Sequence, residues 1–270
     1  MRVTAGGVGT EYDVGGVGRP VVLLHGFPDS GRLWRHQVPV LRDAGYQVIV
    51  PDLRGYGRSD KPVGVAAYAM QELVGDVAAM LDQLDIERAH LVGHDWGAAL
   101  GWALAMRRPE RVDHFVALSV GHPAAMRMAG LRQLQKSWYM LLFQFPGIAE
   151  QWLAGDDWAN FRALSRHPDA DEVIAELSRN GSLTPALNWY RANVPPESLL
   201  RPPTPPPPVQ APTMGVWSHQ DIALTEEQMK RSQEYVTGTW RYERVPDAGH
   251  WMQLDVPGVV SELLVDFLPT

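Results

Sequence analysis

The chain has 270 residues, of which 45% are hydrophobic, no cysteine, and a formal net charge of −7. This is enough for one sizeable core, and it excludes thiol catalysis and any dependence on disulfides. The acidic balance gives no electrostatic reason to expect nucleic acid or an anionic membrane as a partner. The sequence shows no signal-peptide pattern and no apolar run of about 18 residues, so we expect a cytoplasmic protein without a membrane span.

Short apolar runs alternate with helical periodicity along the first 120 residues, which is typical of a parallel sheet with crossover helices. After residue 121 the pattern changes to helices rich in Trp and Met, and it returns near residue 213. The predicted strands are 21–24, 47–50, 89–93, 112–120, 213–217 and 239–245. The predicted helices outside the insert are 32–44, 68–84, 96–107, 225–234 and 256–267.

We therefore predict one α/β core, residues 1–121 and 209–270, interrupted by a helical insert at residues 122–208. The insert ends in Pro202–Pro208, which is almost all proline. Such a segment forms polyproline II, and it is interpreted as a stiff spacer in preference to a docking site for an SH3-like partner.

The motif Gly93-His94-Asp95-Trp96-Gly97 lies between a predicted strand and a predicted helix. It has the spacing of a nucleophile elbow, with Asp in the place of Ser. Glycines two positions before and after permit a strained turn that lifts the central side chain above the sheet. Asp95 could instead be an ordinary N-cap, but a cap needs no glycine at both positions. The pattern therefore favours Asp95 as a nucleophile.

Together with this motif, four other blocks resemble the epoxide hydrolase branch of the α/β-hydrolases, which also includes haloalkane dehalogenases. They are His25-Gly26-Phe27-Pro28, the Asp52–Ser59 loop, Ser218-His219-Gln220-Asp221 and Asp247-Ala248-Gly249-His250-Trp251. The resemblance covers nearly the whole chain. It implies an α/β-hydrolase fold with a mostly parallel eight-stranded sheet flanked by helices and a helical cap inserted after the sixth strand.

The resemblance also assigns catalytic roles. Asp95 attacks a carbon of the substrate and forms an alkyl ester, and His250 activates the water that hydrolyses this ester. Asp221 orients His250 and offsets its charge. The backbone N–H groups of Phe27 and Trp96 are the expected oxyanion hole. Asp52 is a weaker candidate for the acid because it precedes the nucleophile in the chain.

Two tyrosines of the insert, Tyr139 and Tyr190, lie in blocks that resemble those bearing the family's epoxide-binding phenols. A phenol stays protonated at neutral pH and can donate toward an opening epoxide oxygen. The other residues expected to support or line the substrate pocket are His25, Gly26, Pro28, Trp138, Trp189 and Trp251. The implied reaction adds water to an apolar epoxide and gives a vicinal diol.

Two alternatives stay open. A haloalkane dehalogenase would use the same triad, with the Trp96 indole and a second donor binding the halide. Phe27 occupies the position where such enzymes usually carry an Asn as the second donor. A Trp of the insert could supply that second donor instead. A silent binding protein on this scaffold is the other alternative, disfavoured because all three triad positions and both tyrosines are present.

The remaining histidines show no pairing pattern, and no metal or cofactor is expected. His94 is expected to pack behind the elbow. The others, expected at the surface or in the core, are His36, His90, His114, His122 and His167. The sequence does not specify which epoxide is used, its stereochemistry or the carbon attacked, nor the physiological role, nor whether the protein is a monomer or a dimer.

Overall fold

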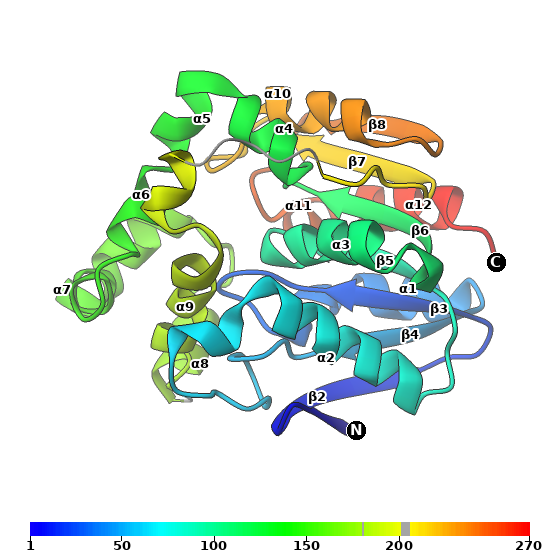
Figure 1. Cartoon of the computed structure of the whole chain (residues 1–270), viewed down its shortest axis with the longest axis horizontal. Coiled ribbons are helices and arrows are strands. Elements are labelled where there is room, and N and C mark those ends of the chain that lie inside the picture. The colour runs from blue at the N-terminus through cyan, green and yellow to red at the C-terminus, as the bar shows by residue number, and fades with distance from the viewer. Residues whose placement is uncertain (180, 201–205) are drawn as a thin grey trace.

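Eight strands form one sheet in the order β1-β2-β4-β3-β5-β6-β7-β8 (Figure 1). Strands β3 to β8 run parallel, and β1 and β2 pair antiparallel at one edge. The computed structural model describes residues 1–179, 181–200 and 206–270. The strands are β1 (Arg2–Ala5), β2 (Val8–Gly15), β3 (Arg19–Leu24), β4 (Tyr46–Pro51), β5 (Ala89–His94), β6 (Val112–Leu118), β7 (Thr213–Ser218) and β8 (Trp240–Val245). The predicted sheet is confirmed, and each of the six strands located from sequence lies within two residues of its predicted bounds.

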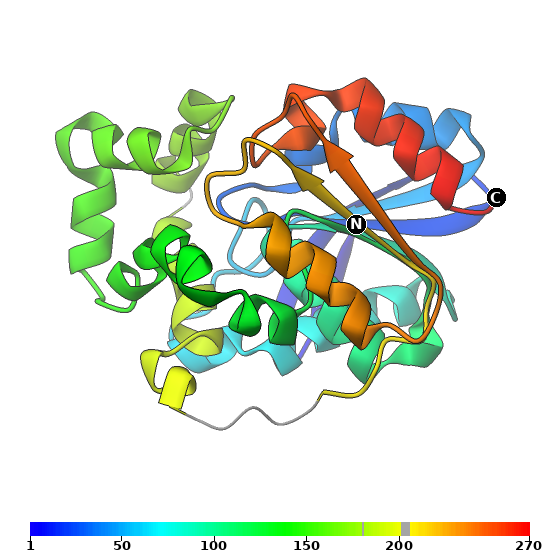
Figure 2. The same cartoon turned by 90° about the horizontal axis from the view of Figure 1, so that it is seen from above.

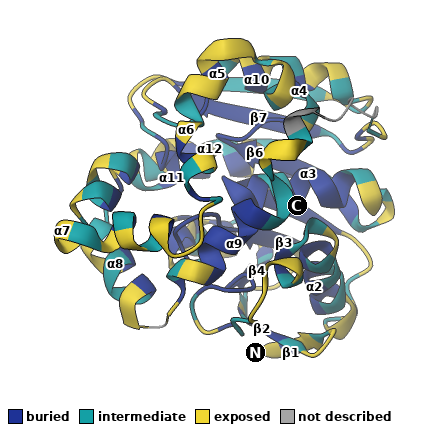
Figure 3. Ribbon diagram, turned by 60° about the vertical axis from the view of Figure 1, so that its left-hand side comes forward, coloured by how far each residue is buried: buried dark blue, intermediate teal, exposed yellow. Residues whose placement is uncertain are grey.

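Helices cover both faces of the sheet, so its central strands are buried on both sides. In β3, Val22 and Leu24 belong to the core cluster under α2 (Met70–Gln83) and α3 (Trp96–Arg107). Val21 and Leu23 belong to the cluster under α1 (Gln37–Asp43) and α12 (Pro257–Phe267). This alternation follows from the two-residue period of a strand, and burial on both faces explains why the strand is a continuous apolar run. Figure 2 shows the two helical layers on opposite sides of the sheet, and Figure 3 shows the sheet among the buried parts of the molecule.

The helices of the core agree with prediction except that two predicted helices, 32–44 and 225–234, are each divided into an α-helix and a 3₁₀ helix, and that α11 was not predicted. They are α1 (Gln37–Asp43), α2 (Met70–Gln83), α3 (Trp96–Arg107), α10 (Glu226–Arg231), α11 (Met252–Asp255) and α12 (Pro257–Phe267), with short 3₁₀ helices η1 (Gly31–Trp34), η2 (Val65–Tyr68), η3 (Pro109–Arg111) and η5 (Ser232–Tyr235). The predicted helix 32–44 is wrong as one element, since it is divided into η1 and α1. The division places Pro39 in the first turn of α1, where its missing N–H costs no helical hydrogen bond.

A group of helices lies between β6 and β7 and packs at one end of the sheet (Figure 1). Its members are α4 (Pro123–Met128), α5 (Gly130–Lys136), α6 (Trp138–Leu142), α7 (Ile148–Ser165), α8 (Ala170–Arg179), α9 (Leu183–Asn193) and the 3₁₀ helix η4 (Pro196–Leu200). Helix α7 is kinked at residues 155–158, where the backbone leaves helical geometry. Most of the proline-rich segment Pro202–Pro208 lies outside the described residues. Among the helices that are described, none is long and apolar enough to cross a membrane.

A buried ion pair connects the loop after β4 to helix α2. Arg54 donates two hydrogen bonds to Asp76, from Nε at 2.8 Å and from Nη2 at 2.6 Å. Both side chains are almost fully buried. Burial raises the pKa of Asp76 even beside Arg54. Burial of this pair therefore costs free energy, and each charge mainly compensates the other. Removal of one partner would leave the other charge buried and uncompensated.

We expect Asp76→Ala to lower the free energy of unfolding by about 3–5 kcal/mol, because it leaves the Arg54 guanidinium buried without a partner. Asp82→Ala is the matched control, since Asp82 lies in the same helix and its carboxylate pairs with Arg111 at the surface. That change should cost about 0–1 kcal/mol. Urea unfolding followed by tryptophan fluorescence measures both, and equal losses would contradict the structural role given to Asp76.

Candidate active site

Asp95 occupies a strained turn between β5 and α3. Its backbone has φ 52° and ψ −120°, a region that non-glycine residues rarely adopt. A Cβ on Gly93 would lie 2.4 Å from the Gly97 carbonyl oxygen, and one on Gly97 would lie 2.0 Å from the Leu24 carbonyl oxygen. Only glycine fits at these two positions. The predicted elbow geometry is therefore present, with Asp95 directly before the first residue of α3.

The loop after β3 brings a backbone N–H group to the Asp95 carboxylate. The Phe27 N–H donates to Asp95 Oδ1 at 2.8 Å. This approach depends on Gly26, because a Cβ there would lie 2.4 Å from Asp95 Oδ1 and 2.6 Å from the Trp96 nitrogen. The two residues expected to form an oxyanion hole, Phe27 and Trp96, thus flank the same carboxylate.

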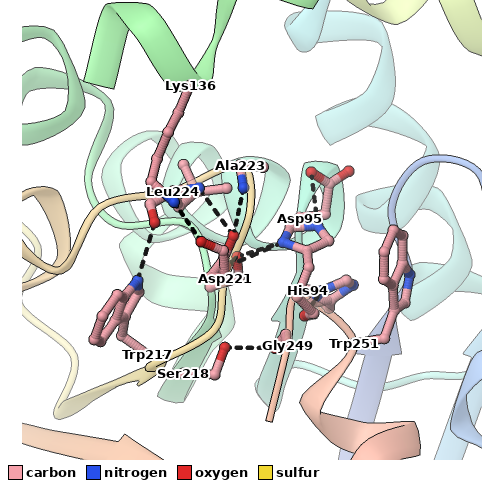
Figure 4. Close-up of polar contacts among 12 residues, drawn as sticks. His94, Asp95, Lys136, Trp217, Ser218, Asp221, Ala223, Leu224, Gly249 and Trp251 are labelled. Carbon is pink, nitrogen blue, oxygen red and sulfur yellow. Dashed lines mark hydrogen bonds and ion pairs between the residues drawn. The ribbon is translucent and has the colours of Figure 1, made fainter. Parts of the chain in front are cut away.

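His250 lies between two carboxylates that come from distant parts of the chain. Its Nε2 is 3.7 Å from Asp95 Oδ2, and its Nδ1 is 3.1 Å from Asp221 Oδ2. Figure 4 shows Asp95 and Asp221 converging on this space, with Trp251 on the side of Asp95 away from Asp221. The structure therefore brings together the three predicted triad residues.

Further hydrogen bonds hold Asp221 in its ionised form. Its Oδ1 accepts from the N–H groups of Ala223 at 2.8 Å and Leu224 at 2.9 Å (Figure 4). Burial alone would raise the pKa of this carboxyl, but His250 and the hydrogen bonds, among them that from Ser119, hold it below its usual value. Burial alone would also lower the pKa of His250, whereas Asp221 and Asp95 together raise it to about 10. The resting site thus favours an imidazolium between two carboxylates.

Tyr139 on α6 and Tyr190 on α9 both reach the space above Asp95. Their side chains are 8% and 2% exposed, and their ring centroids are 6.1 Å apart. Burial, followed by the charge of Asp95, raises the pKa of both phenols, so both stay protonated. In the described part of the chain, these two side chains and Asp95 border two cavities, of about 360 Å³ and 400 Å³.

Both cavities are lined mainly by apolar and aromatic side chains. The aromatic residues that line the first include Phe27, Trp138, Phe143, Trp152, Phe161 and Trp251. The second is lined by Trp96, Met106, Met126 and Met140 beside small residues. Such walls accept an apolar molecule. Polar side chains other than those around Asp95 also border the cavities, namely Lys136, Asn160, Ser165 and Arg166 in the first and Arg107 and Asn193 in the second.

The remaining predicted support residues occupy distinct places. His25 is buried, accepts from the Leu53 N–H at 2.9 Å and lies 3.1 Å from the Gly26 carbonyl, which orders the loop bearing Phe27. Pro28 follows Phe27 through a cis peptide bond. Trp189 lines neither cavity of Asp95, and its indole N–H donates to the Arg54 carbonyl at 3.0 Å. Trp189 therefore supports the site from outside the two cavities.

Ser119 is a residue of the site that sequence reasoning missed. Its hydroxyl donates to Asp221 Oδ2 at 2.6 Å and lies 3.0 Å from His250 Nδ1. The sequence predicted a strand that continued to Val120, which placed Ser119 in a strand interior. The strand ends at Leu118, and Ser119 has a positive φ of 72° that turns it toward the triad. The available signal was a small hydroxyl residue at the carboxyl end of a parallel strand.

A second buried cluster was also missed. Asp29 accepts from the Trp251 indole at 2.9 Å and lies 3.1 Å from His167 Nε2. The expectation that His167 has no partner is therefore wrong. His167 follows α7, so this contact connects the helical group to the loop after β3. Burial would raise the pKa of Asp29, but His167 keeps it below its usual value.

Two other predicted assignments concern an acid and a histidine near the elbow. Asp52 accepts from the Gly31 N–H at 2.9 Å and from Arg58 Nε at 2.8 Å, so its carboxylate orders a loop. His94 is fully buried and donates from Nε2 to the His250 carbonyl at 2.9 Å. Burial lowers the pKa of His94 to about 4, so it is a neutral packing residue beneath the triad.

The arrangement has a definite chemical capacity. An ionised carboxylate faces an apolar space and can attack an electrophilic carbon. Two phenols on the opposite wall can donate hydrogen bonds to an oxygen that leaves that carbon. The imidazole behind the carboxylate can take a proton from water. Alkylation of the carboxylate by the substrate carbon, followed by hydrolysis at the carbonyl carbon of the resulting ester, is therefore possible with these groups and water.

Known proteins share this fold and this architecture. A family model described as alpha/beta hydrolase fold matches residues 19–257. Epoxide hydrolase A of Mycobacterium tuberculosis is 34% identical over 95% of this chain and 92% of that protein. The AB hydrolase superfamily protein YfhM of Bacillus subtilis is also 34% identical, over 92% of this chain and 89% of that protein.

A solved structure agrees with these sequence relatives. The structure of a Bacillus megaterium epoxide hydrolase in complex with an inhibitor superposes with a TM-score of 0.89 at 30% identity. The alignment covers 99% of both chains, so it includes the sheet and the helices between β6 and β7. The chain belongs to the α/β-hydrolase fold family and, within it, to the epoxide hydrolases.

Proposed function

We propose that this protein hydrolyses apolar epoxides to vicinal diols through an alkyl ester on Asp95. The observation that carries the proposal is the position of two buried, protonated phenols, Tyr139 and Tyr190, beside the cavities that also contain Asp95. An epoxide differs from other carbon electrophiles in that its leaving oxygen stays attached to the molecule. Phenols aimed at that oxygen suit this substrate.

The first step opens the ring. Asp95 forms a C–O bond to one epoxide carbon as the C–O bond to the ring oxygen breaks, and that oxygen receives a proton from Tyr139 or Tyr190. The carboxylate needs no prior deprotonation. The hydrogen bond from the Phe27 N–H holds Asp95 Oδ1. Oδ2, the oxygen nearer His250, is therefore the attacking atom.

The second step hydrolyses the ester. His250 takes a proton from a water molecule, and the water oxygen adds to the ester carbonyl carbon. The N–H groups of Phe27 and Trp96 stabilise the oxyanion, an interaction whose loss typically costs about 100–1,000-fold. The tetrahedral intermediate then releases the diol and restores the carboxylate. After ring opening, the proton of the resting imidazolium of His250 returns the tyrosinate to a phenol, which leaves His250 neutral for the second step. The proton that His250 then takes from water stays on it, and the hydroxyl of the tetrahedral intermediate supplies the proton of the departing alkoxide, so both steps sum to the addition of one water.

The electrostatics of the site fit this order of events. In the resting site, Asp95 helps to raise the pKa of His250 to about 10, which makes the imidazole a poor base at neutral pH. Forming the ester removes the charge of Asp95 and with it part of that upward shift. His250 therefore becomes a better base when the ester is present, and Asp221 and Ser119 hold its Nδ1 side.

A haloalkane dehalogenase would need a second donor to the halide beside the Trp96 indole, and neither Trp189 nor Phe27 provides one. Trp189 donates its indole N–H to the Arg54 carbonyl, and Phe27 has no side-chain donor. Trp138 and Trp152 do line the cavity, so the substrate assay below includes haloalkanes. A silent binding protein would have no need for a complete buried triad.

We retain the proposed division into a core of residues 1–121 and 209–270 and a cap of residues 122–208.

A panel of aryl and alkyl epoxides and haloalkanes, assayed separately for diol and for halide, tests the proposed reaction. A Bacillus megaterium relative was solved with a naphthyloxy-propanediol product, so aryloxy epoxides belong in the panel. We expect diol formation from apolar epoxides, none by Asp95→Ala, and no halide release. Halide release without diol formation would overturn the assignment.

In His250→Gln we expect ring opening to proceed while ester hydrolysis stalls, because the base for the second step is absent. Intact mass spectrometry after addition of an epoxide should then show an increase equal to the whole epoxide mass. Peptide mapping should place it on Asp95. Normal turnover by this variant, or an adduct on another residue, would contradict the proposed roles.

We expect Tyr139→Phe and Tyr190→Phe each to slow ring opening, by about 100-fold or more, since each removes a hydrogen-bond donor to the developing alkoxide. The double variant should be nearly inactive. Tyr242→Phe is the control, because Tyr242 lies on β8 and donates a hydrogen bond to Glu226 outside the site. Single-turnover kinetics measures the ring-opening rate. Unchanged rates in all variants would mean that the two phenols only pack.

A further inference from the structure

Three side chains of metal-ligand type meet near the starts of β5 and β6. His90 Nδ1 is 3.6 Å from Asp113 Oδ2, and His114 Nδ1 is 3.7 Å from Asp113 Oδ1. The ligand atoms of the three residues all lie within 4.8 Å of one another. Liganding atoms of a tetrahedral Zn²⁺ site are about 3.3–3.6 Å apart, given bond lengths near 2.0–2.2 Å. A small contraction would therefore place one ion in contact with all three.

An irregularity in the sheet creates this grouping. Ala89 pairs with Val112, but Leu91 pairs with Phe115, so His90 alone faces two residues of β6, Asp113 and His114. Adjacent residues of a regular strand point to opposite faces, whereas a bulge can re-aim one of them. The bulge here directs both Asp113 and His114 toward His90.

The tautomer of His90 prepares it for a cation. Its Nε2 lies 3.0 Å from the Pro269 carbonyl oxygen, which can only accept, so Nε2 carries the proton. In the neutral ring, Nδ1 then presents a lone pair, and it faces a carboxylate that is also an acceptor. His90 is 1% exposed, and the Nδ1 atoms of both His90 and His114 are buried without a hydrogen-bond partner. A buried lone pair that faces a carboxylate oxygen, as His90 Nδ1 does here, is unfavourable unless a cation lies between them.

We propose that His90, Asp113 and His114 form a binding site for a divalent transition-metal ion, with Zn²⁺ as the best match. Two imidazole nitrogens and one carboxylate oxygen are ligands that Zn²⁺ accepts readily, and a backbone carbonyl on the far nitrogen is the usual outer partner of a metal-bound histidine. Asp113 and His114 are partly exposed, which leaves a path for the ion and room for a water ligand. The expectation of no metal rested on motif spacing, which does not register a strand bulge.

Arg19 competes with the ion for the same carboxylate. Its Nη1 donates to Asp113 Oδ2 at 3.1 Å, and its side chain is 51% exposed. Binding a metal requires this guanidinium to move into solvent, which its exposure allows. Removing the Arg19 charge should therefore strengthen metal binding, whereas removing any ligand should weaken it. A role of these residues in packing alone predicts neither effect.

The site is separate from the catalytic residues. His90 and Asp95 are five residues apart along β5 and the turn that follows it, which corresponds to about 16 Å. In Figure 1 the C-terminus, whose Pro269 contacts His90, lies at the side of the molecule opposite α6 to α9. A bound ion would join β5, β6 and the C-terminal segment, so we expect it to stabilise the fold and to leave epoxide turnover unchanged.

The test uses the full chain without a polyhistidine tag, freed of metal by a chelator and titrated with Zn²⁺ by calorimetry. Co²⁺ serves as a second probe, because its visible absorption reports tetrahedral coordination. We expect one ion per chain, affinity lowered more than about tenfold by Asp113→Asn or His114→Gln, and affinity raised by Arg19→Gln. His36→Gln, at an exposed histidine, and His250→Gln, in the triad, should bind as the unaltered chain does.

Stability and activity measurements complete the test. Zn²⁺ should raise the melting temperature of the unaltered chain but not that of His114→Gln, and both proteins should hydrolyse epoxide at the same rate without metal. Absence of binding, or binding that survives both ligand substitutions, would overturn the proposal. Binding lost only in His250→Gln would place the ion in the catalytic site and would also overturn it.

Discussion

The structure depends on one strained backbone position, Asp95, held at positive φ between β5 and α3. The strain is possible because Gly93 and Gly97 remove the side chains that would otherwise collide with backbone carbonyls. Gly26 then lets the loop after β3 approach the carboxylate closely enough for the Phe27 N–H bond. The parallel sheet places the carboxyl ends of β3, β5, β6, β7 and β8 on one side, where the loops that carry the other site residues meet. A change at any of the three glycines would displace the nucleophile from all its partners.

Around that position, burial and charge set the protonation of each group. Asp95, His250 and Asp221 are buried together and stabilise one another, which is the condition under which buried charges are tolerated. The same burial keeps Tyr139 and Tyr190 protonated. The resting site therefore already favours the protonated phenols and the carboxylate that ring opening uses, whereas His250 rests as an imidazolium. Formation of the ester removes the charge of Asp95, and that change releases His250 to act as a base.

Residues whose roles follow from local patterns were predicted from sequence, and residues whose roles follow from irregular geometry were not. The elbow, the Phe27 loop and the His250 block each combine a short motif with a strand or helix boundary, and the structure brings them together. Ser119 escaped prediction because its role depends on a strand that ends two residues early. The partner of His167 escaped because Asp29 lies 138 residues away in the chain. Trp189 was placed in the correct block, but only packing showed that its indole faces Arg54.

The sequence by itself determined the class of fold and the chemical nature of the nucleophile, because apolar periodicity specifies parallel strands and the paired glycines specify the turn. It determined six of the eight strands and the order of the triad along the chain. Tertiary structure decided which hydroxyl supports Asp221, which tryptophan lines the cavity and where His90 meets Asp113 and His114. These depend on register, on a bulge and on contacts between distant segments. Such features arise from packing of the whole chain, and short-range patterns along the sequence do not encode them separately.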